Sequence, residues 1–308
     1  MKYFDLHCDT IGECSKNNLS LRDNNLHIDL QRTKGIEEYT QVFAVWIPDE
    51  LRGEDAVAYF DKTADYFYKE IEANKDLVSL YNEPNQTSVK AILSVEGGSA
   101  CAGTIEGLHH LYERGVRLIT LTWNAVNEIG SGAFSEGGLT PFGRVFIKEA
   151  EKLGIVLDVS HLNRQSFFEL AEIAEKPFVA SHSNGDIVDN KYGRKRNLNK
   201  EQIQIIKQRN GLIGLNFCRD FIETENAKGI DALCHQIDYM LSLGCEDVIA
   251  IGSDYDGCGI HKDLCGIEKI PLLFHELLNR KIDEKIINKL FYENAKNFFK
   301  KYNKSLGR

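Results

Sequence analysis

The chain has 308 residues, of which 43% are hydrophobic and 27% charged, a composition that excludes disordered, collagen-like and disulfide-scaffold proteins. Its 37 basic and 46 acidic residues give a formal net charge of -9, and a field of this sign repels phosphate backbones and anionic lipid. The sequence therefore predicts a globular protein without a nucleic-acid or membrane partner.

The first ten residues carry charges where a signal peptide would need an apolar stretch, and no segment reaches the roughly 18 to 20 apolar residues that span a bilayer. We therefore expect a cytoplasmic location. In that compartment the eight cysteines are expected to be free thiols. Cys258, His261 and Cys265 lie close enough in sequence to bind a metal ion, but no fourth ligand with zinc-finger spacing accompanies them.

Short apolar runs alternate with longer amphipathic segments along the chain. We predict strands at residues 3–6, 41–46, 90–95, 118–122, 155–159, 178–181, 212–216 and 248–252. We predict helices at residues 56–73, 107–114, 143–153, 164–174, 200–208, 231–243 and 284–299. This alternation indicates parallel strands joined by crossover helices.

Eight such units most simply close into a (β/α)8 barrel of the TIM type, with an open doubly wound sheet as the alternative. Runs such as LIGLNF from Leu212 are nearly continuous in apolar residues, as expected for strands covered on both faces. Because no repeat or Pro/Gly/Ser-rich linker divides the chain, we predict a single domain over residues 1–308. The active site of such a barrel lies at the carboxyl ends of its strands.

Metal-ligating residue types stand at the carboxyl ends of four predicted strands. They are His7, Asp9, Glu96, His161 and His182. Each alone is explained by an ordinary hydrogen bond or salt bridge, but independent explanations do not account for their shared location. Three imidazoles and two carboxylates are enough to hold two metal ions joined by one carboxylate.

Two other segments carry candidate groups. Asp254 in GSDYDG follows the eighth strand, where a carboxylate that faces a dinuclear site can move a proton between water and leaving group. Asp256 in the same segment fits an Asx-type turn equally well. The run GRKRNLN after the sixth strand contains three cations at residues 194–196, and an arginine beside a metal pocket is suited to bind a substrate carboxylate.

Taken in order, the segments that hold these residues resemble the renal or membrane dipeptidase family of zinc peptidases. The similar segments run from residue 5 to about residue 257 and are HCD, SVEGG, RLITLTWN, LTPFG, GIVLDVSHL, SHSN, RNL and GSDYDG. The resemblance implies a barrel with two zinc ions per chain. His7 and Asp9 would bind one ion, His161 and His182 would bind the other, and Glu96 would bridge both.

The resemblance also implies roles for the substrate-facing residues. Arg196 would bind the terminal carboxylate of a dipeptide, and Asp254 would be the acid/base group. Animal members of the family have a histidine after the fourth strand that helps to polarise the scissile carbonyl, whereas this chain has Trp123. Since an indole cannot carry a positive charge, we expect Trp123 to line the pocket and Asn124 or the metal ions to supply the missing donor.

The sequence thus predicts a metallo-dipeptidase in which a metal-bridging hydroxide attacks the peptide carbonyl and Asp254 passes the proton to the leaving amine. The family tolerates a D-residue at the carboxyl-terminal position of the dipeptide. One alternative is a related metal-dependent amidohydrolase that cleaves N-acyl amino acids or cyclic amides. Another is a metal-stabilised binding protein without catalytic activity. The sequence leaves open whether the chain forms a homodimer.

Overall fold

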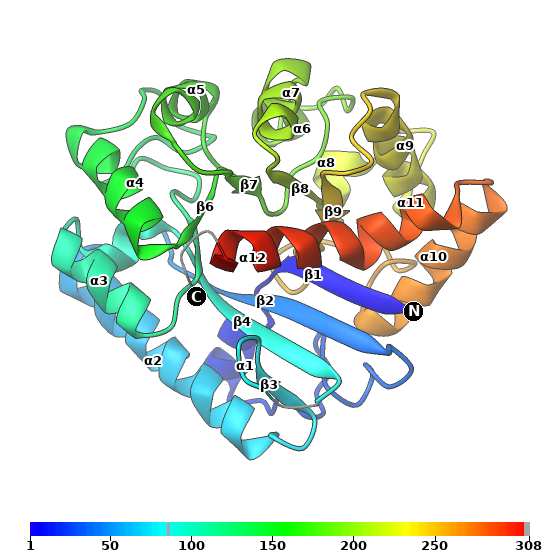
Figure 1. Ribbon diagram of the computed structural model, residues 1–308, viewed down its shortest axis with the longest axis horizontal. Helices are drawn as coiled ribbons and strands as arrows, with labels where there is room; N and C mark the ends of the chain where they lie inside the picture. The colour runs from blue at the N-terminus through cyan, green and yellow to red at the C-terminus, as the bar shows by residue number, and fades with distance from the viewer. Residues whose placement is uncertain (85–86, 305–308) are drawn as a thin grey trace.

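A ring of eight parallel strands forms the centre of the molecule (Figure 1). The computed structural model describes residues 1–84 and 87–304. The ring runs in the order β1 (Lys2–Cys8), β2 (Glu38–Trp46), β4 (Val89–Glu96), β5 (Leu118–Thr120), β6 (Val156–Asp158), β7 (Val179–Ala180), β8 (Leu212–Leu215) and β9 (Ile249–Ile251). It closes because β1 pairs with both β2 and β9. The short strand β3 (Val78–Leu80), which the sequence did not predict, pairs with β4.

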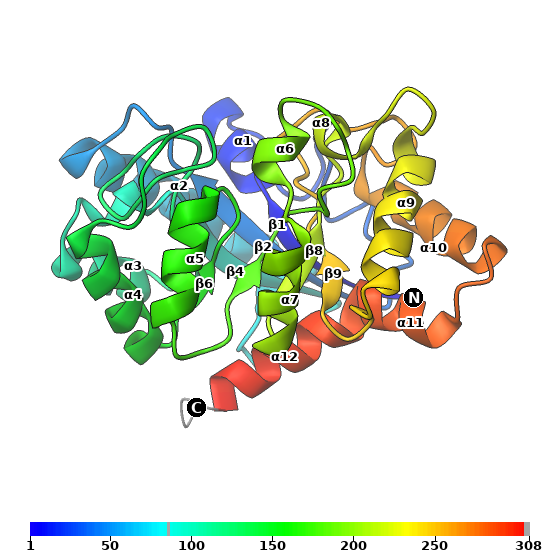
Figure 2. The same cartoon turned by 90° about the horizontal axis from the view of Figure 1, so that it is seen from above.

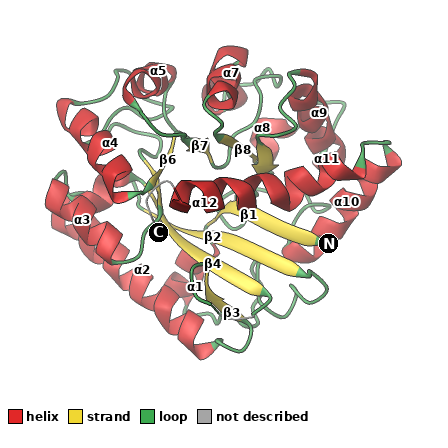
Figure 3. Ribbon diagram, viewed as in Figure 1, coloured by secondary structure: helices red, strands yellow, loops and turns green. Residues whose placement is uncertain are grey.

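Helices surround this ring (Figure 3), which confirms the predicted TIM-type (β/α)8 barrel. The α-helices around the ring and at its two ends are α1 (Thr10–Asn17), α2 (Gly53–Ala73), α3 (Ile105–Glu113), α4 (Pro141–Leu153), α5 (Arg164–Ile173), α6 (Gly193–Arg196), α7 (Lys200–Gln208), α8 (Arg219–Ile222), α9 (Gly229–Ser242), α10 (Ile270–Asn279), α11 (Glu284–Asn288) and α12 (Asn294–Lys304). The predicted helix at 284–299 is divided, because a π-helical turn at Lys289–Glu293 separates α11 from α12. Within the described residues, none of the helices combines the length and the apolarity needed to cross a membrane.

Side-chain caps mark the start of the outer helices α3, α4, α5 and α7. The side chains of Thr104, Thr140, Asn163 and Asn199 each accept a hydrogen bond from a backbone N–H in the first turn of the helix that follows. At Asn199 the side chain of Gln202 bonds back to the cap, which completes a capping box. These caps end the loops before these helices at a defined residue.

Apolar side chains fill one half of the barrel interior. Every strand of the ring contributes to this cluster, through Phe4, Leu6, Val42, Ile92, Leu118, Val156, Val179, Leu212 and Ala250. Helix α12 closes the same end with Ala295, Phe298, Phe299 and Tyr302. Figure 2 shows α12 at one end of the barrel and α1, α6 and α8 at the other. The interior at the carboxyl ends of the strands is therefore left for polar side chains.

An irregularity in β1 changes the direction of its last side chains. Asp5 pairs with Gln41 and Cys8 pairs with Phe43, so three steps along β1 match two steps along β2. A bulge of this kind breaks the alternation of side chains between the two faces of a strand. The consecutive residues Leu6 and His7 therefore both face the barrel interior. The buried carboxylate of Asp5 stabilises the bulge by accepting hydrogen bonds from the His7 backbone N–H (3.2 Å) and from that of Ser253 (2.9 Å).

Candidate metal centre

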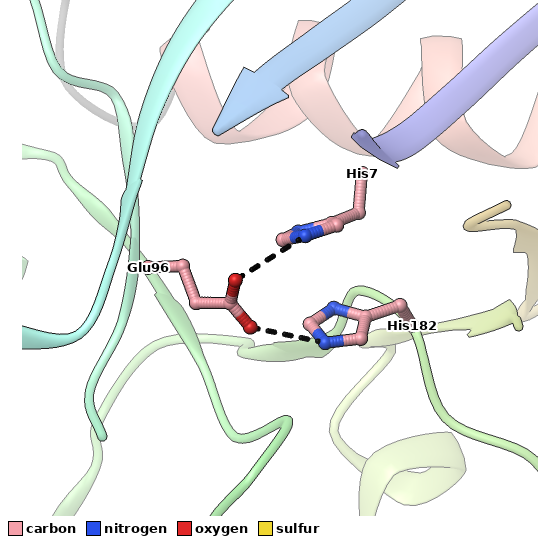
Figure 4. Close-up of side chains that lie close together, drawn as sticks. All are labelled: His7, Glu96 and His182. Carbon is pink, nitrogen blue, oxygen red and sulfur yellow. Dashed lines mark ion pairs between the residues drawn. The ribbon is translucent and has the colours of Figure 1, made fainter. Parts of the chain in front are cut away.

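The five side chains predicted as metal ligands meet at the carboxyl end of the barrel interior. Glu96, at the end of β4, directs one carboxylate oxygen toward His7 and the other toward His182 (Figure 4). Its Oε2 atom is 3.6 Å from His7 Nε2, and Oε1 is 2.9 Å from His161 Nε2 and 3.3 Å from His182 Nε2. Asp9 Oδ2 is 3.3 Å from His7 Nε2. The Glu96 carboxylate thus faces His7 with one oxygen and the pair His161 and His182 with the other.

Hydrogen bonds fix the proton position on the two histidines that follow β6 and β7. Ser181 Oγ donates to a carboxylate oxygen of Asp158 (2.6 Å), so the same hydroxyl oxygen accepts from His182 Nδ1 (2.7 Å). His161 Nδ1 donates to the amide oxygen of Asn124 (3.0 Å). Both imidazoles therefore carry their proton on Nδ1 and direct an unshared electron pair of Nε2 toward Glu96.

This arrangement brings two imidazole acceptors, Nε2 of His161 and Nε2 of His182, against one oxygen of Glu96. His161 Nε2 and His182 Nε2 are 2.9 Å apart. Burial, together with the positive charge of Arg196 and His7, lowers the pKa of both histidines well below the usual range, so that neither supplies a proton. Electron pairs that converge in this way repel one another unless a cation lies among them. The donor set therefore fits a divalent metal ion.

The group around His7 fits a cation for a second reason. Neither ring nitrogen of His7 nor Oδ1 of Asp9 has a hydrogen-bond partner among the described residues, although all are buried. Burial opposes protonation of His7, yet the carboxylates of Glu96 and Asp9 outweigh it and raise the pKa of His7 to about 10. Among the residues that the structure describes, two sets of three ligand-type side chains have atoms within 4.8 Å of one another: His7, Glu96 and His182, and His7, Asp9 and Asp254.

Asp254 approaches the same centre from the loop after β9. Its Oδ2 atom accepts a hydrogen bond from Asn216 Nδ2 (2.9 Å), while Oδ1 lies 4.0 Å from His7 Nε2. Both Asp254 (φ 61°) and His161 (φ 67°) adopt the left-handed backbone conformation, which is costly for residues other than glycine. A Cβ atom at Gly257 would lie 2.2 Å from Asp9 Oδ2 and 2.4 Å from Asp254 Oδ1, so only glycine leaves room for both carboxylates.

Arg196 brings a positive charge to the edge of this acidic centre. The residue ends α6 in the loop after β7, is only 5% exposed, and has no hydrogen-bond partner for Nε among the described residues. Its guanidinium lies 5.2 Å from the ring of Phe221. Burial lowers the pKa of Arg196, while Asp254 and Glu96 act in the opposite direction. A buried guanidinium with an unused donor can form a forked pair with a carboxylate ligand.

A cavity of about 710 Å³ joins these groups. It reaches Asp9, Glu96, His161, Arg196 and Asp254, and its wall includes both Trp123 and Asn124. Asn124 lies in this wall and also holds His161 through the hydrogen bond to Nδ1 described above. A cavity of this size, in which polar groups converge on one point, is typical of a small-molecule site.

The other candidate metal ligands in the sequence, Cys258, His261 and Cys265, do not converge on one point in the structure. Cys258 Sγ contacts the backbone oxygen of Asp254 (3.5 Å), and Cys265 Sγ lies 3.1 Å from His27 Nε2. His261 pairs instead with Asp263. The three side chains therefore have separate partners.

Several residues of the site were not predicted. Asn216, which forms a hydrogen bond with Asp254, directly follows β8, and Ser181, which forms a hydrogen bond with His182, directly follows β7. Trp46 ends β2 and lines the cavity beside Trp123. Their common signal is a polar or amphipathic residue at, or directly after, the end of an apolar strand, the same signal that identified Glu96.

Comparison with known proteins identifies the family. The family model described as membrane dipeptidase (peptidase family M19) matches residues 1–305. A protein of Klebsiella pneumoniae, described as an uncharacterized protein in the pqqA 5' region, is 31% identical over 215 residues, which cover 66% of this chain and 78% of that protein.

Two solved structures resemble the chain over almost its full length. The dipeptidase AC, a metallo peptidase of family M19, is 25% identical with a TM-score of 0.88 over 96% of each chain. A metallo peptidase from Rhodobacter sphaeroides, solved with a phosphinate mimic of the dipeptide L-Ala-D-Ala, shares the fold with a TM-score of 0.88 at 24% identity, over 96% of this chain and 97% of that one. Because the family model spans nearly all of the sequence, the chain belongs to the membrane dipeptidase family, peptidase family M19, and is a metallo-dipeptidase.

Proposed function

We propose that the protein hydrolyses the peptide bond of free dipeptides with two zinc ions, which His7 with Asp9 and His161 with His182 would hold and Glu96 would bridge. The observation that carries the proposal is the convergence of unprotonated imidazole nitrogens on one buried carboxylate, in the same cavity as a buried arginine. The metal ions, when bound, supply Lewis acidity and lower the pKa of a water molecule.

The side chains of the protein orient the substrate and move the proton. Arg196 binds the terminal carboxylate, which fixes the scissile bond relative to Glu96 and sets the direction of the dipeptide. Asp254 accepts a proton from the attacking water and delivers it to the leaving nitrogen. Its Oδ1 atom is free for this task because Asn216 holds only Oδ2.

The proposal also covers the range of substrates, the number of domains and the cellular compartment. Dipeptides with a carboxyl-terminal D-residue are included, since the Rhodobacter sphaeroides metallo peptidase binds a mimic of L-Ala-D-Ala. We propose that residues 1–308 act as one domain, because one ring of strands and one interior carry the whole site. A cytoplasmic location is a separate part of the proposal.

A substrate panel tests the proposed reaction. Zinc-loaded protein is assayed on free dipeptides of L,L and L,D configuration, on N-acyl amino acids and on cyclic amides. We expect release of amino acids from the dipeptides alone. Hydrolysis of acyl amino acids or cyclic amides in preference to dipeptides would make the protein an amidohydrolase of another specificity, and turnover of none of them would support a binding protein.

The role of Arg196 gives a further prediction. Replacing Arg196 by Ala should cost about 2 to 4 kcal/mol in kcat/KM on free dipeptides, because a buried charge pair with the substrate is lost. Dipeptide amides, which lack that carboxylate, should be affected much less. Arg194→Ala is the matched control, since Arg194 is exposed and paired with Asp189. An equal loss on acids and amides in Arg196→Ala would remove Arg196 from this role.

A further inference from the structure

We infer that Trp46 and Trp123 receive the side chain of the amino-terminal residue of the dipeptide and select a large apolar residue, aromatic or leucine-like, at that position. The inference rests on the proposed dipeptide hydrolysis and adds the class of substrate.

The two tryptophans form an apolar corner of the cavity wall. Their ring centroids are 5.0 Å apart and the ring planes meet at 72°. Both side chains are half-buried, and Val45 and Pro48 extend the same wall. The indole nitrogen of Trp46 is buried without an acceptor among the described residues, so packing rather than a hydrogen bond holds this ring in place. The corner therefore offers shape and apolar surface instead of polar contacts.

The order of strands gives the direction in which a substrate lies. Arg196 follows β7, and Phe221, which its guanidinium contacts, follows β8. Trp46 ends β2, which is four strands away from β7 in either direction around the ring and so lies opposite it. The predicted metal ligands occupy the interior between these two sides. A dipeptide with its carboxylate on Arg196 and its peptide bond at the centre must extend its amino-terminal residue toward Trp46.

An apolar corner discriminates by the area that it removes from water. A phenylalanine or leucine side chain would cover both indole rings, whereas an alanine methyl group would leave them exposed to solvent. The cavity volume of about 710 Å³ is large enough for a dipeptide with such a side chain. The gain in selectivity is expected to be about 10- to 100-fold in kcat/KM, the range found for apolar pockets that distinguish large from small groups.

Kinetics on matched dipeptides test the inference. Zinc-loaded protein is assayed on Phe-Ala, Leu-Ala and Ala-Ala, and on Ala-Phe and Ala-Leu. In the parent protein, Phe-Ala and Leu-Ala should exceed Ala-Ala by at least about tenfold in kcat/KM. Trp46→Ala should bring this ratio close to one. Leu272→Ala, which removes an exposed side chain of α10 outside the cavity, should leave the ratio unchanged.

A second variant tests the direction. Phe221→Ala, on the Arg196 side, should alter the ratio of kcat/KM for Ala-Phe to that for Ala-Ala. It should leave the ratio of kcat/KM for Phe-Ala to that for Ala-Ala unchanged. The reverse result, with amino-terminal selectivity lost in Phe221→Ala and kept in Trp46→Ala, would overturn the inference. Equal cleavage of Phe-Ala and Ala-Ala by the parent would also overturn it and leave the proposed function standing. Failure to cleave any dipeptide would contradict the proposed function itself.

Fluorescence provides a readout that needs no turnover. The chain contains two tryptophans, and both line the cavity, so intrinsic tryptophan fluorescence reports on this wall alone. The conservative variants Trp46→Phe and Trp123→Phe keep an aromatic ring and leave one reporter each. A phosphinate analogue of Phe-Ala should change the emission of both variants more than the analogue of Ala-Ala does. Unchanged emission at concentrations that inhibit the enzyme would contradict the inference.

Discussion

Replacing Asp254 by Asn is expected to lower kcat by about 100-fold or more, the scale of general acid/base catalysis. Asn keeps the shape of the side chain and can still bond to Asn216, but it cannot accept the proton from water. Metal content and KM should stay near their parent values. The measurement is kcat and KM on a free dipeptide, together with metal analysis of the same sample.

The matched control for this change is Asp247→Asn, which makes the same substitution at an exposed residue paired with Lys289. It should behave like the parent protein. If Asp254→Asn hydrolyses dipeptides at the parent rate, Asp254 is not the proton carrier. If it loses a metal ion instead, Asp254 is a ligand, as its position beside His7 and Asp9 would allow.

Replacing Glu96 by Gln is expected to weaken both metal positions at once. The two oxygens of Glu96 face different histidines, and an amide keeps one oxygen while it replaces the other with a donor and removes the charge. We expect the affinity for both ions to fall by at least about 100-fold, since even residues outside the ligand set change metal affinity 10- to 100-fold. Activity should fall with the metal content.

Equilibrium dialysis against zinc of known free concentration measures this effect, and Glu72→Gln on the exposed face of α2 is the control. Loss of one ion from Glu96→Gln with the other held at parental affinity would show that Glu96 serves one position and not two.

The strand ends were predictable because they combine two strong signals. A polar residue directly after an apolar run is expensive to bury without a purpose, and the carboxyl ends of parallel strands share one end of a barrel. Glu96 after AILSV and His182 after FVAS both follow this rule. The order of the elements and the geometry of a barrel were enough to predict that these two side chains lie close together.

Other features depend on contacts that the sequence does not show. The bulge in β1 inserts one residue between Asp5 and Cys8, and two backbone N–H groups bond to the Asp5 side chain there, one of them from Ser253 almost 250 positions later. The proton positions on His161 and His182 depend on Asn124 and Ser181, whose side chains are hydroxyls and amides that occur in many contexts. Long-range partners of this kind are set by tertiary packing rather than by local pattern.

Trp46 illustrates a third limit. Its position at the end of β2 was predictable, but an aromatic residue at the end of a strand is more often part of a core than of a binding wall. Only its contact with Trp123, which comes from the loop after β5, places both rings in one cavity.

Zinc titration of metal-free protein tests the central claim of a dinuclear centre most directly. The protein is treated with a chelator, dialysed, and titrated with zinc while bound metal and dipeptide hydrolysis are both measured. Activity should be absent at the start and reach its maximum at about two bound ions per chain. Full activity in protein that contains no metal, or a maximum at one bound ion per chain with no further change, would contradict the dinuclear site that we propose for His7, Asp9, Glu96, His161 and His182.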